Sequence, residues 1–432
     1  MVKPQQDRDA ADGATLAREV PASRRRPGDL RVAMIGFGMR RELARWLHRP
    51  NEGSRVVTVV DSDPAARQRV EEMLGTSTGF EEDYRALQSA DLDAAVVLTP
   101  DDTHHAIARH LLRLQVPVYL EKPIALTAHD ADDLLEVAFE RGTPLFVGHN
   151  MRHSPVVRLM RDVIRQGEIG EVKAIWCRHF VGYGGDYYFR DWHADRSRTN
   201  SLLLQKGSHD LDVIHWLAGS YTREVVAMGG LTLYGEGSGR REHPQGLMED
   251  WFSASAWPPK SLPTLNPTVD VEDISMVLMR LESGVFASYQ QCHYTPDYWR
   301  NYTVVGTEGR LENFGDVGGG VVTLWNRRTR HSPRGDRTYT IPGDEEGHRD
   351  ADELTVQEFL RFVRDGRPTE TSPIAARQSV AVAAAATASL RDGSTLRQIE
   401  AIPRHLTAYF DNNQLHLGPD GSHRRVPSSG NN

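Results

Sequence analysis

Residues 30–41, LRVAMIGFGMRR, constrain the fold of this chain more than any other stretch. An apolar run ends in a glycine-containing turn, and a segment of helical character, ELARWLHRP, follows directly. A strand that passes through glycine into a helix N-terminus presents backbone N–H groups and a helix dipole to a pyrophosphate. The stretch therefore predicts a strand–turn–helix unit that binds a dinucleotide. The predicted cofactor contacts in this turn are Gly36, Phe37, Gly38, Met39 and Arg40.

A second apolar run, residues 55–60, ends in Asp61 at the spacing typical of a dinucleotide-binding unit. A carboxylate at the tip of the second strand accepts hydrogen bonds from the adenosine ribose and repels a 2′-phosphate. Asp61 therefore favours NAD, while Ser62 and Arg67 leave NADP use open. Arg41 stands where the fingerprint has glycine or alanine, which indicates a looser turn or an arginine near the pyrophosphate. The alternative is a doubly wound domain that binds no nucleotide.

Between residues 30 and 150, apolar strands alternate with helical stretches, as a doubly wound parallel sheet requires. The expected strands are 31–35, 55–60, 93–98, 116–120 and 144–148, and the expected helices include 64–75 and 103–115. Parallel strands end at one edge of the sheet, which is where ligands bind in such folds. Thr99, Pro100, Glu121 and Lys122 follow two of these strands, so we expect them to contact the cofactor.

After about residue 171 the pattern changes to half-buried alternating strands joined by short glycine turns. This pattern predicts a large, mostly antiparallel open sheet with one face covered by helices. The expected strands are 172–180, 224–234, 274–281, 285–293, 301–306 and 321–326. The expected cover helices are 155–167, 207–217, 352–365 and 374–391. Segment 235–270, rich in Gly, Pro and Ser, is expected to be a long loop or insertion.

The predicted fold is thus α/β, with an N-terminal Rossmann domain and a C-terminal α/β domain. We place the Rossmann domain at 29–150 and the substrate-binding and oligomerisation domain at 151–403. The polar ends, 1–28 and 404–432, are expected to be disordered tails.

Composition excludes several classes of protein. The 432 residues carry a formal net charge of −8, which argues against a general nucleic-acid binder. There is no stretch of about 18 consecutive apolar residues, so we expect no membrane span. Cys177 and Cys292 match no metal or redox spacing and suit a cytoplasmic protein. His209 and His215 lack the spacing of a helical zinc pair, so no metal is predicted.

Glu121-Lys122-Pro123 closes the fourth apolar strand of the first domain. A lysine at this edge, beside the cofactor, can hydrogen-bond a substrate hydroxyl and stabilise alkoxide character as hydride leaves the carbon. An exposed Glu-Lys pair after a strand is the alternative. Pro123 makes a cis peptide bond worth checking.

In its GFG turn, the Asp61 position, Glu-Lys-Pro and Gly148-His149-Asn150-Met151-Arg152, the chain resembles the Gfo/Idh/MocA oxidoreductases. The resemblance continues through Val271-Glu272-Asp273 and Gly306-Thr307-Glu308-Gly309 to the alanine-rich helix ending in Leu390-Arg-Asp-Gly393. It implies bound NAD(H) or NADP(H), a sugar, polyol or cyclitol substrate, and a homodimer or homotetramer formed through the C-terminal sheet.

The resemblance also implies a catalytic histidine at His209, four residues after a position that is usually aspartate. Imidazole can take the hydroxyl proton because its ordinary pKa lies near neutrality. In this chain the aspartate position holds Gln205, and Lys206 follows as a candidate substrate contact. Gln205 or Asp212 would then orient His209. A histidine on the helix surface without a catalytic role is the alternative.

Further candidates surround these positions. The segment 183–200 is rich in aromatic and hydrogen-bonding side chains, which suits either sugar binding or domain packing. Arg152 is either a ligand contact or part of an ion pair, and His104 is a possible cofactor neighbour, whereas His105 and His215 are expected to be structural. The substrate contacts proposed in the aromatic segment are Tyr188, Arg190, Trp192 and His193.

Three functions fit these residues. The first is NAD-dependent oxidation of a secondary alcohol on a sugar, cyclitol or sugar-like molecule, with Lys122 and His209 at the reacting oxygen. The second is a redox-neutral enzyme that oxidises a sugar carbon transiently and cleaves a glycosidic bond. The third is a cofactor-binding sensor or scaffold without catalysis, which Gln205 favours and the presence of both Lys122 and His209 opposes.

Overall fold

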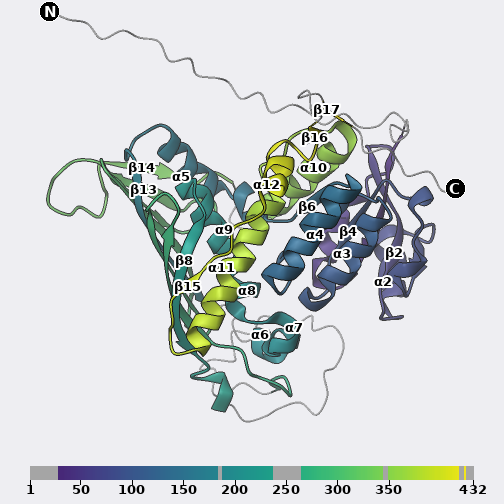
Figure 1. The fold of residues 1–432 in the computed structure, drawn as a ribbon, viewed down its shortest axis with the longest axis horizontal. Coiled ribbons are helices and arrows are strands. Elements are labelled where there is room, and N and C mark those ends of the chain that lie inside the picture. Colours follow the sequence, from purple (N-terminus) through teal and green to yellow (C-terminus); the bar gives the residue numbers. More distant parts are fainter. Residues whose placement is uncertain (1–27, 183–186, 237–263, 344–348, 418–422, 425–432) are drawn as a thin grey trace, which may run out of the picture.

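The computed structural model describes residues 28–182, 187–236, 264–343, 349–417 and 423–424. Over these residues the chain builds two main sheets, one parallel and one mostly antiparallel, with helices packed on and between them (Figure 1). Residues 1–27 of the expected N-terminal tail and residues 237–263 of the expected insertion lie outside the described part of the chain.

The first sheet is parallel, with the strand order β3-β2-β1-β4-β5-β6, and confirms the predicted doubly wound sheet. Its strands are β1 Leu30–Ile35, β2 Ser54–Val60, β3 Gly79–Glu81, β4 Ala94–Val97, β5 Val118–Leu120 and β6 Leu145–Val147. Its helices are α1 Ala44–Leu47, α2 Ala66–Leu74, α3 His104–Arg113 and α4 Ala128–Arg141. The prediction missed β3, because a three-residue edge strand carries no apolar run.

The second sheet has the order β14-β13-β12-β11-β7-β10-β9-β8-β15. Among its described pairs, β7 and β10 run parallel and the others antiparallel, which confirms a large, mostly antiparallel sheet. The strands are β7 Val172–Val181, β8 Thr222–Gly230, β9 Ile274–Leu281, β10 Phe286–Cys292, β11 Tyr298–Gly306, β12 Arg310–Phe314, β13 Val321–Trp325, β14 Arg337–Thr340 and β15 Arg397–Gln398.

Helices cover the inner face of this sheet. Those that contact its strands are α5 Pro155–Arg165, α9 Gly207–Ala218 and α11 Pro373–Arg391, while α6 Tyr187–Arg190 packs on Val181 at the end of β7. Short 3₁₀ helices connect the elements: η1 Met39–Leu43, η2 Tyr84–Ala86, η3 Ser89–Asp91, η4 Asp101–Thr103, η5 Asn150–His153, η6 Trp192–Ala194 and η7 Tyr234–Glu236. Helix α8 Leu202–Gln205 packs on α9 and α11, and α7 Arg196–Thr199 packs on η4, η6 and α8. In β7, Ile175, Cys177 and His179 are buried, whereas Trp176 on the opposite face is exposed. This alternation identifies the face that packs on the helices.

Helix α11 lies between the two sheets in Figure 1 and contacts α4 of the first as well as β8, α8 and α9 of the second. Its many alanines allow this close approach on several sides. Arg377, only 1% exposed, secures the contact by donating to Asp132 of α4 at 2.7 and 2.8 Å. The two sheets are therefore joined through a shared helix.

Helix α10, Arg349–Asp365, packs differently from the expectation. The sequence placed residues 352–365 on the antiparallel sheet. In the structure Val356, Phe359 and Leu360 instead join the core of the parallel sheet, beside Val32 and Phe146. The hydrophobic period gave the helix correctly, but periodicity does not say which of two sheets its apolar face will cover.

The expectation of a disordered tail from residue 404 is wrong for residues 404–417. Helix α12, Arg404–Asp411, buries Leu406, Tyr409 and Phe410, and a short strand β16 His416–Leu417 pairs with β17 His423–Arg424. The side chain of Gln414 exchanges two hydrogen bonds with the backbone of Leu145, at 2.9 and 2.8 Å. An amide side chain thus satisfies the free edge of β6, which the polar composition of this segment could not reveal.

Among the described residues, no helix has both the length and the apolar character needed to cross a bilayer. Both cysteines are free and lie on or at the end of strands of the second sheet, Cys177 buried and Cys292 half-buried.

Candidate active site

The glycine turn lies at the carboxyl edge of the parallel sheet, between β1 and η1. Gly36 has φ +90°, and a Cβ there would lie 2.9 Å from the carbonyl carbon of Leu98, so only glycine fits. The chain continues into the 3₁₀ helix η1 and then α1, rather than directly into an α-helix. Arg41, in place of the usual glycine, donates to the carbonyl of Gly38. Of the neighbouring side chains, Phe37 is fully buried and Met39 is exposed.

Asp61 follows β2 and faces this turn. Its Oδ2 accepts a hydrogen bond from the backbone N–H of Phe37 at 2.7 Å, and its Oδ1 accepts one from Asp63 at 2.9 Å. The partly exposed carboxylate has further lone pairs for a ribose diol. The pyrophosphate of NAD requires a backbone without side-chain bulk, which Gly36 provides. The ribose requires an acid at the end of the next strand, which Asp61 provides, so these residues fit NAD.

Two residues predicted to contact the cofactor serve another role in the structure. The Arg40 guanidinium donates to Glu121 at 2.7 Å and to both oxygens of Asp352 in α10, at 2.8 and 2.9 Å. Burial opposes the charge, but Glu121 and Asp352 raise the pKa of Arg40 well above its usual value. Arg40 and Glu121 thus hold α10 on the first sheet.

His104 has a structural role in the two loops where the cofactor is expected. It is 1% exposed, and its two ring nitrogens lie 2.7 Å from the Pro123 carbonyl oxygen and 2.9 Å from that of Thr99. These contacts fix the two strand-end loops that carry Thr99, Pro100 and Lys122. His105 pairs with Asp133, as expected for a structural residue.

Lys122 lies between the two sheets, after β5, and the Lys122–Pro123 peptide bond is cis. Its Nζ donates a hydrogen bond to the carbonyl oxygen of Gln205 at 2.9 Å. Burial lowers the pKa of Lys122, while Asp101 and Glu121 oppose that shift. An ammonium has three donors, so Lys122 retains donors for a substrate oxygen.

Asp101 was not among the site residues predicted from the sequence. It begins η4 directly after Pro100, is 4% exposed and accepts a hydrogen bond from Thr199 at 3.4 Å. Burial raises the pKa of Asp101 to about 7, although Lys122 acts in the opposite direction. Its position after a strand of the parallel sheet was a usable signal, since Thr99 and Pro100 were chosen on that ground.

His209 lies in the first turn of α9, with its Nδ1 buried and without a hydrogen-bond partner in the described structure. Burial lowers the pKa of His209 well below its usual value, and Lys122 and Arg300 add to the shift. The imidazole is therefore neutral near pH 7, as a proton acceptor must be before the reaction, although the same shift makes it a weaker base. The ring of His149, from the GHNMR segment, lies edge-on at 6.4 Å between centroids, and neither of its nitrogens has a described hydrogen-bond partner.

The structure changes the roles predicted around His209. Asp212 is bound by the guanidinium of Arg152 through two hydrogen bonds of 2.7 Å, so it does not orient His209. Arg152 accordingly forms an ion pair, one of the two roles predicted for it. Gln205 ends α8 and His209 follows in α9, because the helix is divided at Lys206. The Oε1 atom of Gln205 is buried without a described partner and remains available to a ligand.

The side chains of the aromatic segment 183–200 that the structure describes lie in two places, some near Lys206 and some farther from it. Tyr188 is 7% exposed, and its ring centroid lies 5.0 Å from that of His193 and 5.6 Å from the Nζ of Lys206. Trp192 stacks on His193 at 3.7 Å. Arg190 ends α6 and is half-buried. Tyr188 and His193 therefore lie near Lys206, whereas Trp192 packs behind His193.

A buried charged network on the inner face of the second sheet was also missed. Asp210 of α9 accepts hydrogen bonds from His179 at 3.0 Å and from the Tyr302 hydroxyl, and forms an ion pair with Arg300 at 3.2 Å. Despite burial, Arg300 and His179 lower the pKa of Asp210. The strand period offered a signal, because His179 and Arg300 occupy the same buried face as Cys177 and Tyr302.

His215 is buried, and its Nε2 forms a hydrogen bond of 2.8 Å with the hydroxyl of Thr222. These contacts are typical of a structural residue. Within the described ranges, no group of three His, Cys, Asp or Glu side chains is arranged to hold a metal ion.

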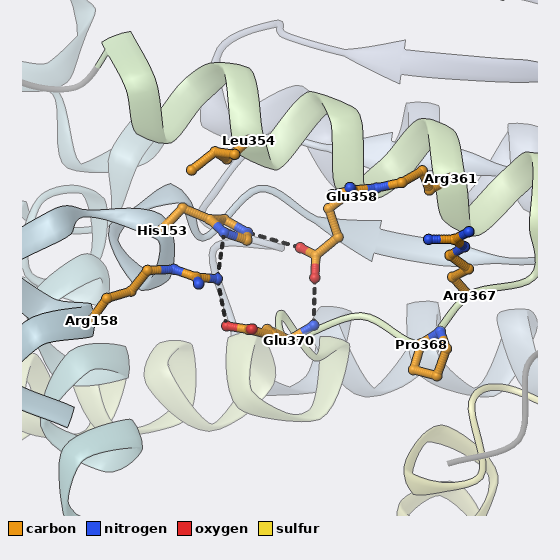
Figure 2. Close-up of a pocket in the computed structure, with 8 residues that line it drawn as sticks. All are labelled: His153, Arg158, Leu354, Glu358, Arg361, Arg367, Pro368 and Glu370. Atoms are coloured by element: carbon orange, nitrogen blue, oxygen red, sulfur yellow. Dashed lines mark hydrogen bonds and ion pairs between the residues drawn. The ribbon is translucent and has the colours of Figure 1, made fainter. Parts of the chain in front are cut away.

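A separate cavity of about 290 Å³ lies beneath α10 and the loop that follows it (Figure 2). His153 points into it and contacts Glu358 at 2.9 Å, while Arg158 binds Glu370 at 2.9 Å. Neither Lys122 nor His209 lines this cavity. It lies behind η5, whose Arg152 faces Asp212.

Two models of one oxidoreductase family match the chain. The model of the NAD-binding Rossmann fold matches residues 30–149, and that of the C-terminal alpha/beta domain matches residues 161–397.

Individual proteins that match the chain share less than a third of their aligned residues with it. A putative oxidoreductase, YteT from Bacillus subtilis, is 26% identical over 256 residues, covering 51% of this chain and 60% of its own length. Inositol 2-dehydrogenase from Burkholderia multivorans is 28% identical over 286 residues, covering 65% of this chain and 72% of its own length. A solved levoglucosan dehydrogenase, in complex with NADH and levoglucosan, superposes with a TM-score of 0.70 at 18% identity. It is covered completely, by 86% of this chain.

Proposed function

The chain belongs to the Gfo/Idh/MocA oxidoreductase family, with an NAD-binding Rossmann domain, and we propose that it dehydrogenates a secondary alcohol. The substrate is a sugar, a cyclitol or a sugar-like molecule, as the names of the inositol and levoglucosan dehydrogenases suggest. The observation that carries this proposal is that Lys122 binds the carbonyl oxygen of Gln205, four residues before His209, whose buried Nδ1 has no described hydrogen-bond partner and whose pKa Lys122 helps to lower.

Each residue has a distinct task in the reaction. Lys122 donates a hydrogen bond to the substrate oxygen and stabilises its developing negative charge, most effectively where water is excluded. His209 accepts the hydroxyl proton, for which a neutral imidazole is required. The free Oε1 of Gln205 accepts a hydrogen bond from the same or a neighbouring hydroxyl. NAD, when bound, supplies the hydride acceptor.

Asp101 extends this assignment. Burial raises the pKa of Asp101 to about 7, and Asp101 and Lys122 each shift the pKa of the other. We therefore expect Asp101 to tune the protonation of Lys122 rather than to contact the substrate.

The first test is spectroscopic. Purified protein is mixed with NAD and a panel of inositols, aldoses and glycosides, and formation of NADH is followed by absorbance and fluorescence. A reduced-nicotinamide signal with one substrate class supports a dehydrogenase. Cleavage of a glycoside without net NADH would favour the redox-neutral alternative. Failure to bind any nicotinamide nucleotide would refute the assignment of Gly36, Gly38 and Asp61.

We further propose that a second copy of the chain covers the outer face of the nine-stranded sheet. Large apolar side chains stand exposed there on neighbouring strands, and Met228 faces Met276 across β8 and β9. A contiguous apolar patch of this kind marks an interaction surface. Light scattering is expected to give a dimer or tetramer that Leu278→Asp dissociates, and a monomeric native protein would contradict this. The exposed side chains are Trp176, Met228, Met276, Leu278 and Phe286.

A further inference from the structure

A second group of polar side chains lies beyond Lys122 and His209, and we call it the inner cluster. It consists of Lys206, His179, His193 and His293, contributed by the α8–α9 junction, β7, η6 and the residue after β10. The ring of Tyr188 lies among them, with centroid distances of 5.0 Å to His193 and 5.4 Å to His293. The Nζ of Lys206 lies 5.6 Å above the same ring.

The histidines of the inner cluster carry unused hydrogen-bonding atoms. His179, His193 and His293 are at most 7% exposed, and each has a buried ring nitrogen without a described hydrogen-bond partner. Buried polar atoms are nearly always paired in folded proteins. The Nδ1 of His179 lies 3.0 Å from the Asp210 carboxylate and 3.4 Å from the Nη2 of Arg300. Donation to the nearer carboxylate places the proton on Nδ1 and leaves Nε2 as an acceptor. The cluster therefore has both donors and acceptors for a ligand.

The ammonium group of Lys206 favours a negatively charged ligand. Its side chain is only partly accessible, and its ammonium makes no hydrogen bond or ion pair in the described structure beyond the Tyr188 ring. The nearby acids are already engaged, Asp210 by Arg300 and Asp316 by the Tyr298 hydroxyl at 2.9 Å. Burial and Arg300 lower the pKa of Lys206 to about 8, so it is still mostly charged near neutrality. Asp210 and Asp316 act on Lys206 only without a direct ion pair, so a partly buried ammonium in this position is stabilised further when an anion binds to it.

We propose that Lys206 binds a carboxylate of the substrate, so that the enzyme prefers a polyhydroxy acid to a neutral sugar or cyclitol. This proposal rests on the proposed dehydrogenase function and specifies its substrate class. Lys206 directly follows Gln205, whose carbonyl oxygen binds Lys122, so the carboxylate is held close to the reacting carbon. The Nε2 of His179 accepts a substrate hydroxyl. A single cation free of ion pairs suits a carboxylate better than a phosphate dianion.

The test compares matched pairs of ligands on the NAD-loaded, full-length protein. D-glucose and D-galactose are paired with D-glucuronate, D-galacturonate, D-gluconate and D-galactonate, and glucose 6-phosphate is added as the alternative anion. Calorimetry measures binding, and NADH formation measures turnover. We expect at least one acid to exceed its neutral partner about tenfold in affinity or in kcat/KM, the scale of one charge-assisted hydrogen bond. Equal or better performance of the neutral sugars, or of the phosphate, overturns the proposal.

Variants of Lys206 separate recognition from folding. Lys206→Gln is expected to bring the acid-to-neutral ratio close to one, mainly by raising KM for the acid, whereas Lys206→Arg retains part of the preference. Lys173→Gln, at an exposed lysine of β7, is the matched control. A ratio that Lys206→Gln leaves unchanged contradicts the proposal.

Different results would contradict the proposed dehydrogenase function and the proposed carboxylate site. Absence of NAD binding defeats the proposed function. NAD binding without binding of any of the four acids defeats only the carboxylate site.

Discussion

The two sheets of this protein build their parts of the site in different ways. In the parallel sheet, β4 is apolar and completely buried, and the polar groups follow the strands, at Gly36, Asp61 and Lys122. In the nine-stranded sheet the polar groups belong to the buried face itself, where His179 and Arg300 meet Asp210. In the first sheet, the site residues lie at the edge and the strands only position them. In the second sheet, the buried polar residues belong both to the core and to the site.

Removal of Arg300 should show this difference most strongly. Arg300→Met leaves Asp210 buried with its charge only partly compensated, so we expect the free energy of unfolding to fall by about 3–5 kcal/mol. Urea denaturation measures the change. Arg280→Met, which removes an exposed partner of Glu224, should cost less than about 1 kcal/mol. Similar values for the two variants would mean that the buried network does not stabilise the second sheet.

At the edge of the first sheet, a substitution should damage chemistry and leave the fold intact. Lys122→Met removes the donor to the substrate oxygen, so kcat should fall about a hundredfold to a thousandfold. Thermal unfolding and NAD titration serve as checks that the protein remains folded and loaded, with Lys173→Met as the control. Full turnover by a folded, NAD-binding Lys122→Met protein would exclude the proposed role.

A substitution of Asp101 tests whether a carboxyl group at the edge of the first sheet is held as a buried acid. Its pKa, about 7 in the folded protein, lies above the ordinary value of 3.8, so the folded state holds the proton more tightly. Stability from this carboxyl group is therefore present at low pH and lost as the pH rises towards 7. Asp101→Asn lacks this loss. Its stability relative to wild type should rise by about 2 kcal/mol between about pH 5 and about pH 8.

Urea denaturation at the two pH values measures that difference, with the exposed neighbour Asp102→Asn as the control. A stability difference independent of pH would show that Asp101 is not held as a buried acid.

The smallest expected effect concerns cofactor choice. Asp61→Ala removes the charge that repels a 2′-phosphate, so the ratio of affinities should move about tenfold towards NADP. Quenching of protein fluorescence by each dinucleotide gives the two dissociation constants. Asp83→Ala, at an exposed acid elsewhere in the same domain, should leave the ratio unchanged. An unchanged ratio in Asp61→Ala would place the ribose elsewhere.

The amino-acid sequence alone determined the architecture and the edge of the first sheet. Apolar runs located β1, β2, β4, β5 and β6, since strands buried on both faces leave a continuous signal. The glycine turn and Asp61 were found because each stands directly after a strand, and Lys122 because it follows β5 with only Glu121 between. These features are local in the chain.

Only the tertiary structure decided the partners. It assigned Asp212 to Arg152 rather than to His209, Arg40 to Asp352 of α10, and α10 to the first sheet. It also brought His179, Lys206 and His293 together from distant segments. Periodicity records whether a side chain is buried, but the group it meets depends on how distant elements pack, and that packing sets the charge of each buried group.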